Sequence, residues 1–428
     1  MTNMRIRLYP PQTLRVEAQL PASKSISNRA LIIQALSARE AQGPVPEVGN
    51  LSDCDDTQVM QRALSDMPEV IDIMAAGTAM RFLTAYLSIT PGTHTITGTE
   101  RMRHRPIGIL VEALRQLGAQ VDYADQEGFP PLRISGRSLP GGTLSLAGDV
   151  SSQYISALLM IAPTMEQGLT LHLTGHIVSR PYIDMTLSIM ADFGAQARWQ
   201  DNHTLRVEPG GYRPTPYTVE NDWSASSYWY EMMALTQDAQ PCVTLHGLFE
   251  QSLQGDSAIR DIFRPLGIAT EFFSDSQGTA SVRLTHHGAP CRHFDYDFVR
   301  QPDLAQTVVV TCAMLGTTFR FTGLQSLKIK ETDRMVALCT ELRKLGIVLK
   351  EEDGETLAWD GTRCTPQDDS AMDTYEDHRM AMSLAPACMV TGHLLMNDPQ
   401  VVSKSYPHFW QELRGFRIVE EEEGETRG

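Results

Sequence analysis

A repeating pattern of apolar and polar positions organises the middle of the chain. An amphipathic stretch ends in a Leu-Gly or Phe-Gly step and leads into a short strand-like run, as in LVEALRQLG, which ends at Gly118 and precedes AQVDY. The same pattern ends at Gly194, Gly267 and Gly346, so it recurs roughly every 75 residues. Glycine commonly ends helices because it adopts the left-handed conformation easily. The pattern predicts a stack of α/β units, each with a helix, a glycine cap and two strands, rather than one doubly wound sheet.

Two further patterns indicate how the chain is divided. The opening MTNMRIRLYPPQTLRVEAQL alternates as strands do. Near residue 220 the turn-rich PGGYRPTP is followed by Asp222 and WSAS, which is typical of a helix N-cap. Because 428 residues exceed what one hydrophobic core usually covers, we predict two domains with a hinge near residue 220. A cleft between two such domains is a favoured place for a small-molecule site.

Composition narrows the class of protein. The chain is 42% hydrophobic and 21% charged, with no apolar run long enough to span a bilayer and no signal-peptide core, so we expect a cytoplasmic protein that does not contact membranes. The seven cysteines are scattered and never spaced as C-x-x-C, which favours reduced thiols and argues against a zinc site. A net charge of -16 without basic runs makes nucleic acid an unexpected partner.

Despite this acidic balance, cations and small hydroxyl or glycine residues gather where helices are predicted to begin. The first such stretch is Ser23-Lys24-Ser25-Ile-Ser-Asn-Arg29, which leads into ALIIQAL. Helix N-termini carry free N–H groups and the positive end of the peptide dipoles, so added cations and hydroxyls make an anion site. Ser25 and Arg29 are four residues apart and share a helix face. Plain N-capping by Ser23 or Ser25 is the alternative.

Similar stretches follow along the chain, each with a simpler alternative. AGTAMR contains Gly77, GDVSSQ contains Ser151 to Gln153, and SRPY begins at Ser179. For AGTAMR the alternative is a tight turn followed by a surface arginine, and for SRPY it is an ordinary helix cap. The simplest interpretation of the basic cluster that ends at Arg105 is a helix face exposed to solvent. In the second half, KIKETDR and YEDHR place carboxylates and cations beside apolar helices, where a salt-bridged helix start is the alternative to a binding or catalytic site. QPDLA adds a lone carboxylate, Asp303, for which a helix cap is the alternative to a general base.

Taken together, these motifs resemble the 5-enolpyruvylshikimate-3-phosphate (EPSP) synthase family of enolpyruvyl transferases. The resemblance covers almost the whole chain through LPASKSISNRAL, AGTAMR, RPIG, GDVSSQ, SRPY, PDLA, KIKETDR, YEDHRMAM and SKSYP, in that order. It implies an α/β fold with two domains, each of three βαβαββ repeats in an inside-out α/β barrel. It also implies that residues 1–20 and 220–428 form a discontinuous domain with phosphoenolpyruvate-side and catalytic residues. Residues 21–219 would form an inserted domain on the shikimate-3-phosphate side, with hinges near 20 and 220.

The resemblance also implies roles for residues that match the family motifs. Proton transfer would use Lys24, Asp303 and Glu331. Shikimate-3-phosphate would be bound by Lys24, Ser25, Arg29, Ser151, Ser152, Gln153, Ser179, Tyr182, Asp303 and Lys330. Phosphoenolpyruvate would be bound by Lys24, Gly77, Arg105, Gln153, Arg334, Arg379 and Lys404. No metal or cofactor is expected, and the protein is expected to be a monomer.

The sequence departs from the family pattern at three positions, and two other functions are alternatives. Ala75 stands where asparagine is usual, Phe82 where proline is frequent, and Ser326 where asparagine is common. One alternative is UDP-N-acetylglucosamine enolpyruvyl transferase, but that family has Lys-Asn where this chain has Lys24-Ser25, and it uses a loop cysteine, whereas no cysteine lies between Cys54 and Cys242. The other is a catalytically inactive homologue. Release of phosphate from shikimate-3-phosphate and phosphoenolpyruvate distinguishes the three.

Overall fold

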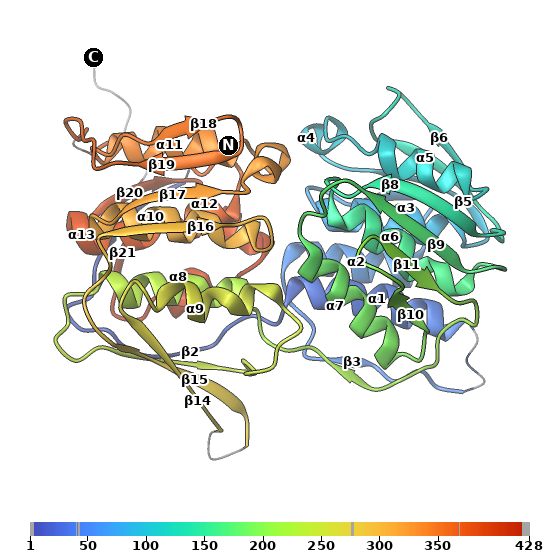
Figure 1. The fold of residues 1–428 in the computed structure, drawn as a ribbon, viewed down its shortest axis with the longest axis horizontal. Helices are drawn as coiled ribbons and strands as arrows, with labels where there is room; N and C mark the ends of the chain where they lie inside the picture. The colour runs from blue at the N-terminus through green and yellow to red at the C-terminus, as the bar shows by residue number, and fades with distance from the viewer. Residues whose placement is uncertain (1–3, 40, 42, 275–277, 368, 422–428) are drawn as a thin grey trace. The chain divides into compact units, whose positions relative to one another are not determined.

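The chain forms two compact units (Figure 1). The computed structural model describes residues 4–39, 41, 43–274, 278–367 and 369–421. One unit, here called the discontinuous unit, consists of Met1–Pro21 and Asn221–Gly428, and the other, the inserted unit, consists of Ala22–Glu220. The chain therefore leaves the discontinuous unit after Pro21 and returns to it at Asn221.

The inserted unit contains two four-stranded sheets with the same βαβαββ topology. One is built from β4 (Val70–Asp72), α3 (Gly77–Ser88), β5 (Gly92–Thr97), α5 (Gly108–Gln116), β6 (Gln120–Tyr123) and β7 (Leu132–Gly136), with strand order β4-β5-β7-β6. The other is built from β8 (Gly142–Ala147), α6 (Ser152–Ile161), β9 (Leu169–Thr174), α7 (Arg180–Asp192), β10 (Ala197–Trp199) and β11 (Thr204–Val207). In each, the first two strands are parallel and the last two antiparallel.

The third repeat of the inserted unit is shorter than the family fold implied. It comprises α1 (Lys24–Ala38), α2 (Asp55–Asp66) and the parallel pair β3 (Val48–Gly49) and β12 (Tyr217–Thr218). Within the described part of the chain, no antiparallel hairpin extends this pair. The short helix α4 (Glu100–Arg103) lies between β5 and α5 in the sequence.

The discontinuous unit has the βαβαββ topology in its first two repeats, while the sheet of its third repeat has three strands. The inserted unit interrupts the first repeat in sequence. Strand β2 (Arg15–Ala18) pairs in parallel with β13 (Cys242–His246), although the whole inserted unit separates them in sequence. The remaining elements of this repeat are α8 (Trp223–Leu235), α9 (Ile259–Phe263), β14 (Ile268–Ser274) and β15 (Ala280–His286).

The other two repeats of this unit contain its candidate site residues. The second is β16 (His293–Asp297), α10 (Ala305–Leu315), β17 (Thr318–Thr322), α11 (Arg334–Lys344), β18 (Lys350–Glu352) and β19 (Thr356–Trp359). The third contains α12 (His378–Leu384), α13 (Cys388–Thr391), α14 (Phe409–Glu412), β20 (Leu394–Asn397) and β21 (Arg417–Glu421), and takes β1 (Arg5–Tyr9) as its central strand. Helices α8, α10 and α12 contact one another in the core.

The repeat glycines adopt the predicted conformation. Gly118 and Gly194 follow α5 and α7 with φ of 98° and 84°, and Gly267 and Gly346 are also left-handed. The amide of Ala119 donates to the carbonyl of Leu114, closing the helix end in the manner of a Schellman motif. Strands β6 and β10 begin two to three residues after these glycines. The predicted sequence of helix, glycine and strand is therefore confirmed. Among the described residues, no helix is both long and apolar enough to cross a membrane.

Helix α8 carries an acidic side chain into the core of the discontinuous unit. Glu231 has no exposed surface, and within the described residues neither of its carboxylate oxygens has a hydrogen-bond partner. Burial raises the pKa of Glu231 well above its ordinary value, because the charged form loses its hydration. Burial raises the pKa of the Cys312 and Cys388 thiols, and the nearby Glu231 adds to the rise.

Glu231 should make the protein less stable as pH rises. The folded state retains a proton that the unfolded chain releases above about pH 4.5, so the free energy of unfolding should fall above that pH by about 1 kcal/mol per pH unit until the folded-state pKa is reached. Chemical denaturation between pH 5 and 7 should show that Glu231→Gln removes this slope. The exposed Glu250→Gln serves as control in the same unit. A slope that is equal in the native protein and in Glu231→Gln would contradict the assignment.

Candidate active site

The first candidate residues of the inserted unit lie at the start of α1. Ser23 caps the helix by accepting from the Ile26 amide at 3.5 Å, so the capping alternative holds for Ser23. Lys24 is the first helical residue, and its Nζ lies 3.5 Å from Oδ2 of Asp56. Asp56 is almost fully buried in the first turn of α2, where the helix dipole favours a carboxylate. Asp56 was not among the residues predicted from the sequence.

Arg29 lies on the same face of α1, one turn after Ser25, and is buried. Its guanidinium donates to the Ser25 carbonyl at 2.8 Å, to Thr186 Oγ1 at 2.7 Å, and to Ser156 Oγ at 3.1 Å. It also reaches the carbonyl of Tyr182 at 3.4 Å. All of these acceptors are neutral, and burial lowers the pKa of Arg29 to about 10. A buried cation held only by neutral oxygens favours an anionic ligand.

Phe82 contributes to the surroundings of Arg29. It is fully buried in α3, and the Arg29 guanidinium carbon lies 5.3 Å from the centre of its ring. The departure from the family pattern at position 82 therefore bears on Arg29 through a cation–π contact.

Gly77 begins α3 and lies against two guanidinium groups. A Cβ added to Gly77 would lie 2.6 Å from Nη1 of Arg105 and 3.0 Å from Nη1 of Arg81. Arg81 Nη1 donates to the Gly77 carbonyl at 2.9 Å. Tyr154 donates its hydroxyl to the carbonyl of Pro106 at 2.6 Å, which fixes the chain next to Arg105. Arg105 is therefore partly buried, unlike Arg101, Arg103 and His104 of the same basic cluster. Those three residues are exposed to solvent, as the simpler interpretation of the cluster predicted.

The hydroxyl and amide candidates lie at the starts of α6 and α7. Ser151 caps α6 by accepting from the Gln153 amide at 3.3 Å, and Ser152 is the first helical residue. Gln153 Nε2 donates to Thr78 Oγ1 of α3 at 3.1 Å, so the two helix starts are connected. Ser179 precedes α7 in the left-handed conformation, and its side chain makes no capping hydrogen bond. The helix starts are as predicted, and Ser151 combines a capping role with its candidate role.

In the discontinuous unit, Arg334 is the centre of an ion-pair network. Arg334 begins α11 and is only 1% exposed. Its guanidinium contacts Asp377 at 2.7 and 3.2 Å, Glu331 at 3.0 Å and Asp303 at 3.3 Å. Burial lowers the pKa of Arg334, but the three carboxylates outweigh burial and raise it above its ordinary value. Arg334 therefore stays charged and holds both predicted catalytic carboxylates.

Asp303 and Glu331 each have further cationic partners. Asp303 contacts Arg379 at 2.9 Å and Lys330 at 3.5 Å, and Glu331 contacts Lys404 at 3.0 Å. Burial raises the pKa of Asp303, but Arg379, Lys330 and Arg334 outweigh it and hold the pKa well below the usual range. Asp303 is therefore ionised at neutral pH.

The pKa of another carboxyl group, that of the buried Asp256, depends on the charge of Asp303. Asp256 accepts a hydrogen bond from the Ser224 hydroxyl, and burial together with the negative charge of Asp303 raises its pKa to about 7. It was not predicted from the sequence, because Asp256 and Asp303 lie in different repeats. Within the described ranges, no group of three or more His, Cys, Asp and Glu side chains is arranged to hold a metal ion.

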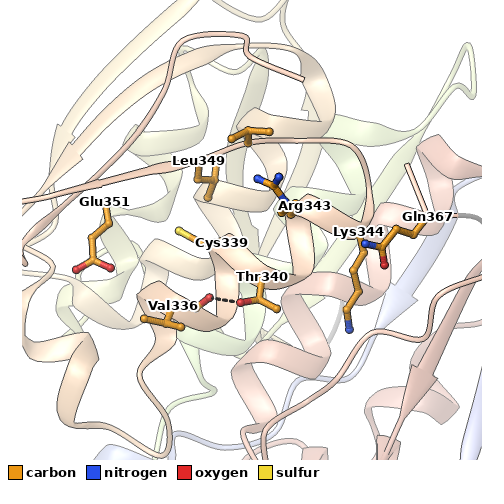
Figure 2. Close-up of a pocket in the computed structure, with 9 residues that line it drawn as sticks. Val336, Cys339, Thr340, Arg343, Lys344, Leu349, Glu351 and Gln367 are labelled. Atoms are coloured by element: carbon orange, nitrogen blue, oxygen red, sulfur yellow. Dashed lines mark hydrogen bonds between the residues drawn. The ribbon is translucent and has the colours of Figure 1, made fainter. Parts of the chain in front are cut away.

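A separate pocket of about 480 Å³ lies on the exposed face of α11 (Figure 2). It is lined by Val336, Cys339, Thr340, Arg343, Lys344, Val348, Leu349, Glu351 and Gln367. None of the predicted site residues lines it. Arg334 lies on the buried face of the same helix, so this pocket and the ion-pair network are distinct features.

Comparison with known proteins decides the family. Residues 64–413 match the sequence profile described as EPSP synthase (3-phosphoshikimate 1-carboxyvinyltransferase). A 3-phosphoshikimate 1-carboxyvinyltransferase of Bacteroides fragilis is 57% identical over 98% of this chain and 100% of its own length. A protein of the same name from Shewanella sp. strain ANA-3 is 34% identical over 96% and 99%. The chain belongs to the EPSP synthase family.

The fold of this EPSP synthase family member also has solved counterparts. An EPSP synthase from Acinetobacter baumannii has a TM-score of 0.76 at 18% identity, covering 97% of this chain and 100% of that one. The enolpyruvyl transferase NikO from Streptomyces tendae has a TM-score of 0.74 at 14% identity, covering 99% and 100%. These likenesses confirm the enolpyruvyl transferase fold predicted from the sequence.

The residues predicted for the EPSP synthase reaction form groups within each unit. The inserted unit contains Lys24, Ser25, Arg29, Gly77, Arg105, the start of α6, Ser179 and Tyr182. The discontinuous unit contains Asp303, Lys330, Glu331, Arg334, Arg379 and Lys404. The structure adds three residues that contact them, namely Asp56, Arg81 and Asp377. It also adds Asp256, whose pKa responds to the charge of Asp303. Their assignment to the two substrates stays a prediction.

Proposed function

We propose that this enzyme transfers the enolpyruvyl group of phosphoenolpyruvate to the 5-hydroxyl of shikimate-3-phosphate in the shikimate pathway of chorismate and aromatic amino-acid biosynthesis. The products are 5-enolpyruvylshikimate-3-phosphate and phosphate. The observation that carries the proposal is the pair Asp303 and Glu331, both held on the buried Arg334 among further cations. This arrangement offers proton-transfer groups where anionic substrates would be attracted.

The reaction requires proton transfer in two stages. The 5-hydroxyl oxygen forms a bond to C2 of phosphoenolpyruvate and loses its proton, while C3 gains one, giving a tetrahedral intermediate. The bond from C2 to the phosphate oxygen then breaks, phosphate leaves, and C3 returns a proton. We assign these transfers to Asp303, Glu331 and Lys24, as the family resemblance implies, and the assignment is supported by the contacts of Asp303 and Glu331 with Arg334, a proposed ligand of phosphoenolpyruvate.

The proposed substrate ligands are mainly cations and hydroxyl groups. Shikimate-3-phosphate would use Lys24, Ser25, Arg29, Ser151, Ser152, Gln153, Ser179, Tyr182, Asp303 and Lys330. Phosphoenolpyruvate would use Lys24, Gly77, Arg105, Gln153, Arg334, Arg379 and Lys404. The neutral surroundings of Arg29 support its assignment to the carboxylate of shikimate-3-phosphate.

Substrate binding should make Asp303 a better base. Its pKa is held down by Arg379, Lys330 and Arg334, of which Arg334 and Arg379 are proposed ligands of phosphoenolpyruvate. An anion that binds these cations partly neutralises their effect, so the pKa of Asp303 should rise on binding. The carboxylate would then be more basic in the loaded enzyme than in the free enzyme.

The direct test is metal-independent release of phosphate. The native protein with both substrates should release phosphate at the same rate in excess chelator, and omission of either substrate should abolish release. UDP-N-acetylglucosamine in place of shikimate-3-phosphate tests the rival transferase and should give no release. Release only with UDP-N-acetylglucosamine, or no release with any acceptor, would overturn the proposed function. Complete loss in chelator would overturn metal independence.

We further propose that the enzyme acts in the cytoplasm as a monomer. The proposal rests on its composition and on the fact that this sequence contains every residue proposed to bind the two substrates. Light scattering coupled to size exclusion should give a mass near 47.5 kDa, and twice that mass would contradict it.

A further inference from the structure

Next to the ion-pair network, the segment before α12 adopts a costly backbone conformation. Tyr375 and Glu376 are consecutive and both left-handed, with φ of 55° and 54°. Side chains other than glycine rarely adopt this conformation, and it persists only where the surroundings impose it. The two residues lead directly into Asp377, which contacts Arg334 and accepts from the amide of Arg379 at 2.9 Å. The strained turn therefore determines where Asp377 and Arg379 lie.

Helix α11 holds this turn at two points on one face. Arg334 and Glu341 are seven residues apart, which places them two turns apart on the same side of a helix. Arg334 contacts Asp377, while Glu341 accepts from the Tyr375 hydroxyl at 2.6 Å and from the Asp373 amide at 3.0 Å. Glu341 is fully buried.

An ion pair with Lys344 holds the Glu341 carboxylate in place. Lys344 contacts Glu341 at 2.8 Å and also Asp373 at 2.9 Å, and it donates to the Ala371 carbonyl at 2.8 Å. The lysine therefore connects α11 to the chain on the N-terminal side of the turn. A hydrogen bond from a hydroxyl to a buried carboxylate is stronger than one between neutral groups.

We propose that Glu341 and Tyr375 are positioning residues for phosphoenolpyruvate binding. They hold the strained turn so that Asp377 orients Arg334 and begins α12 with Arg379 directed at Asp303, where it contacts Oδ2 at 2.9 Å. Neither residue is among the proposed substrate ligands. The inference rests on the proposed function, because Arg334 and Arg379 are the ligands whose positions it explains.

The test compares two variants that loosen the turn with one that does not. Tyr375→Phe removes the hydroxyl that donates to Glu341, and Glu341→Gln removes the negative charge of the acceptor, both with little change of volume. Both should raise the KM for phosphoenolpyruvate by about tenfold, since a hydrogen bond to a charged group is lost. The KM for shikimate-3-phosphate should change less than about twofold, because most of its proposed ligands lie in the inserted unit. Tyr230→Phe is the matched control, because it removes a buried tyrosine hydroxyl that contacts Thr270 at 2.7 Å in the same unit.

Relaxation of the strained backbone should restore binding. Asparagine tolerates the left-handed conformation better than glutamate. Adding Glu376→Asn to Tyr375→Phe should therefore return the KM for phosphoenolpyruvate toward the native value. A merely structural role would lower the melting temperature without this selective shift and rescue.

The outcomes separate the two proposals. An inactive native protein would overturn the proposed function, and the positioning role would fall with it. An active native protein whose Tyr375→Phe and Glu341→Gln variants keep the native KM for phosphoenolpyruvate would overturn the positioning role alone. Equal shifts in the KM of both substrates would also overturn it.

Discussion

Replacing Asp303 by Asn should lower the turnover number for phosphate release by a factor of about 10²–10⁴, which is what a positioned acid or base typically contributes. The amide keeps the shape of the side chain but can no longer accept the proton of the 5-hydroxyl. Steady-state kinetics with both substrates at saturation measures the effect. Turnover within about twofold of the native value would show that Asp303 is not the proton acceptor.

The same substitution should change stability in a way that depends on pH. The pKa of Asp303 in the folded protein lies below its unfolded value, so the carboxylate stabilises the fold above pH 4 and loses this effect as pH falls below the unfolded pKa of about 3.8. Asp303→Asn should therefore lower the melting temperature at pH 7 and change it less at pH 3. The control is Asp360→Asn, which breaks the exposed ion pair with Lys350 and should have little effect on turnover.

Lys24→Met and Glu331→Gln should also reduce turnover by about 10² or more if they share the proton transfers. Their structural surroundings differ, since Lys24 contacts Asp56 and Glu331 contacts Arg334 and Lys404. Near-native turnover in either variant would remove that residue from the proposed chemistry.

Local sequence signals predicted the helix starts well. Ser23, Ser151 and Asp222 cap α1, α6 and α8 because a short polar side chain reaches the free amides of the first turn. The repeat glycines end helices for an equally local reason. These features depend on neighbouring residues, so a reader of the sequence can find them without knowing the fold.

Partners that are distant in sequence could not be predicted in this way. Asp377 contacts Arg334 across 43 residues, and Asp256 and Asp303 become neighbours only when two repeats pack together. Asp56 belongs to the pair Asp55-Asp56, which is ordinary in the first turn of a helix, and nothing local distinguishes the one that contacts Lys24. The local sequence did not distinguish Arg105 from the exposed arginines beside it; only the family resemblance named it, and the structure places it against Gly77.

Gly77→Ala should raise the KM for phosphoenolpyruvate by about 10–100-fold while leaving the fold intact. The added Cβ would lie 2.6 Å from Arg105 Nη1 and 3.1 Å from its Cζ, which are too close for van der Waals contact. The clash involves the far end of a flexible side chain, so the guanidinium moves and the backbone does not have to. Displacing a cation that binds an anion directly costs about one to two factors of ten in affinity.

The melting temperature of Gly77→Ala distinguishes a local effect on phosphoenolpyruvate binding from a general loss of folding stability. Gly77 is the first residue of α3 and has no left-handed backbone conformation, and alanine is the better helix former, so the melting temperature of Gly77→Ala should equal or exceed that of the native protein. Gly108→Ala is the matched control, because Gly108 also begins a helix and its added Cβ would meet nothing closer than 3.4 Å. Both variants should have a native-like KM for shikimate-3-phosphate, whose proposed ligands do not include Arg105. A native KM for phosphoenolpyruvate in Gly77→Ala would show that Arg105 does not bind this substrate, because the geometry leaves its guanidinium no room to stay in place.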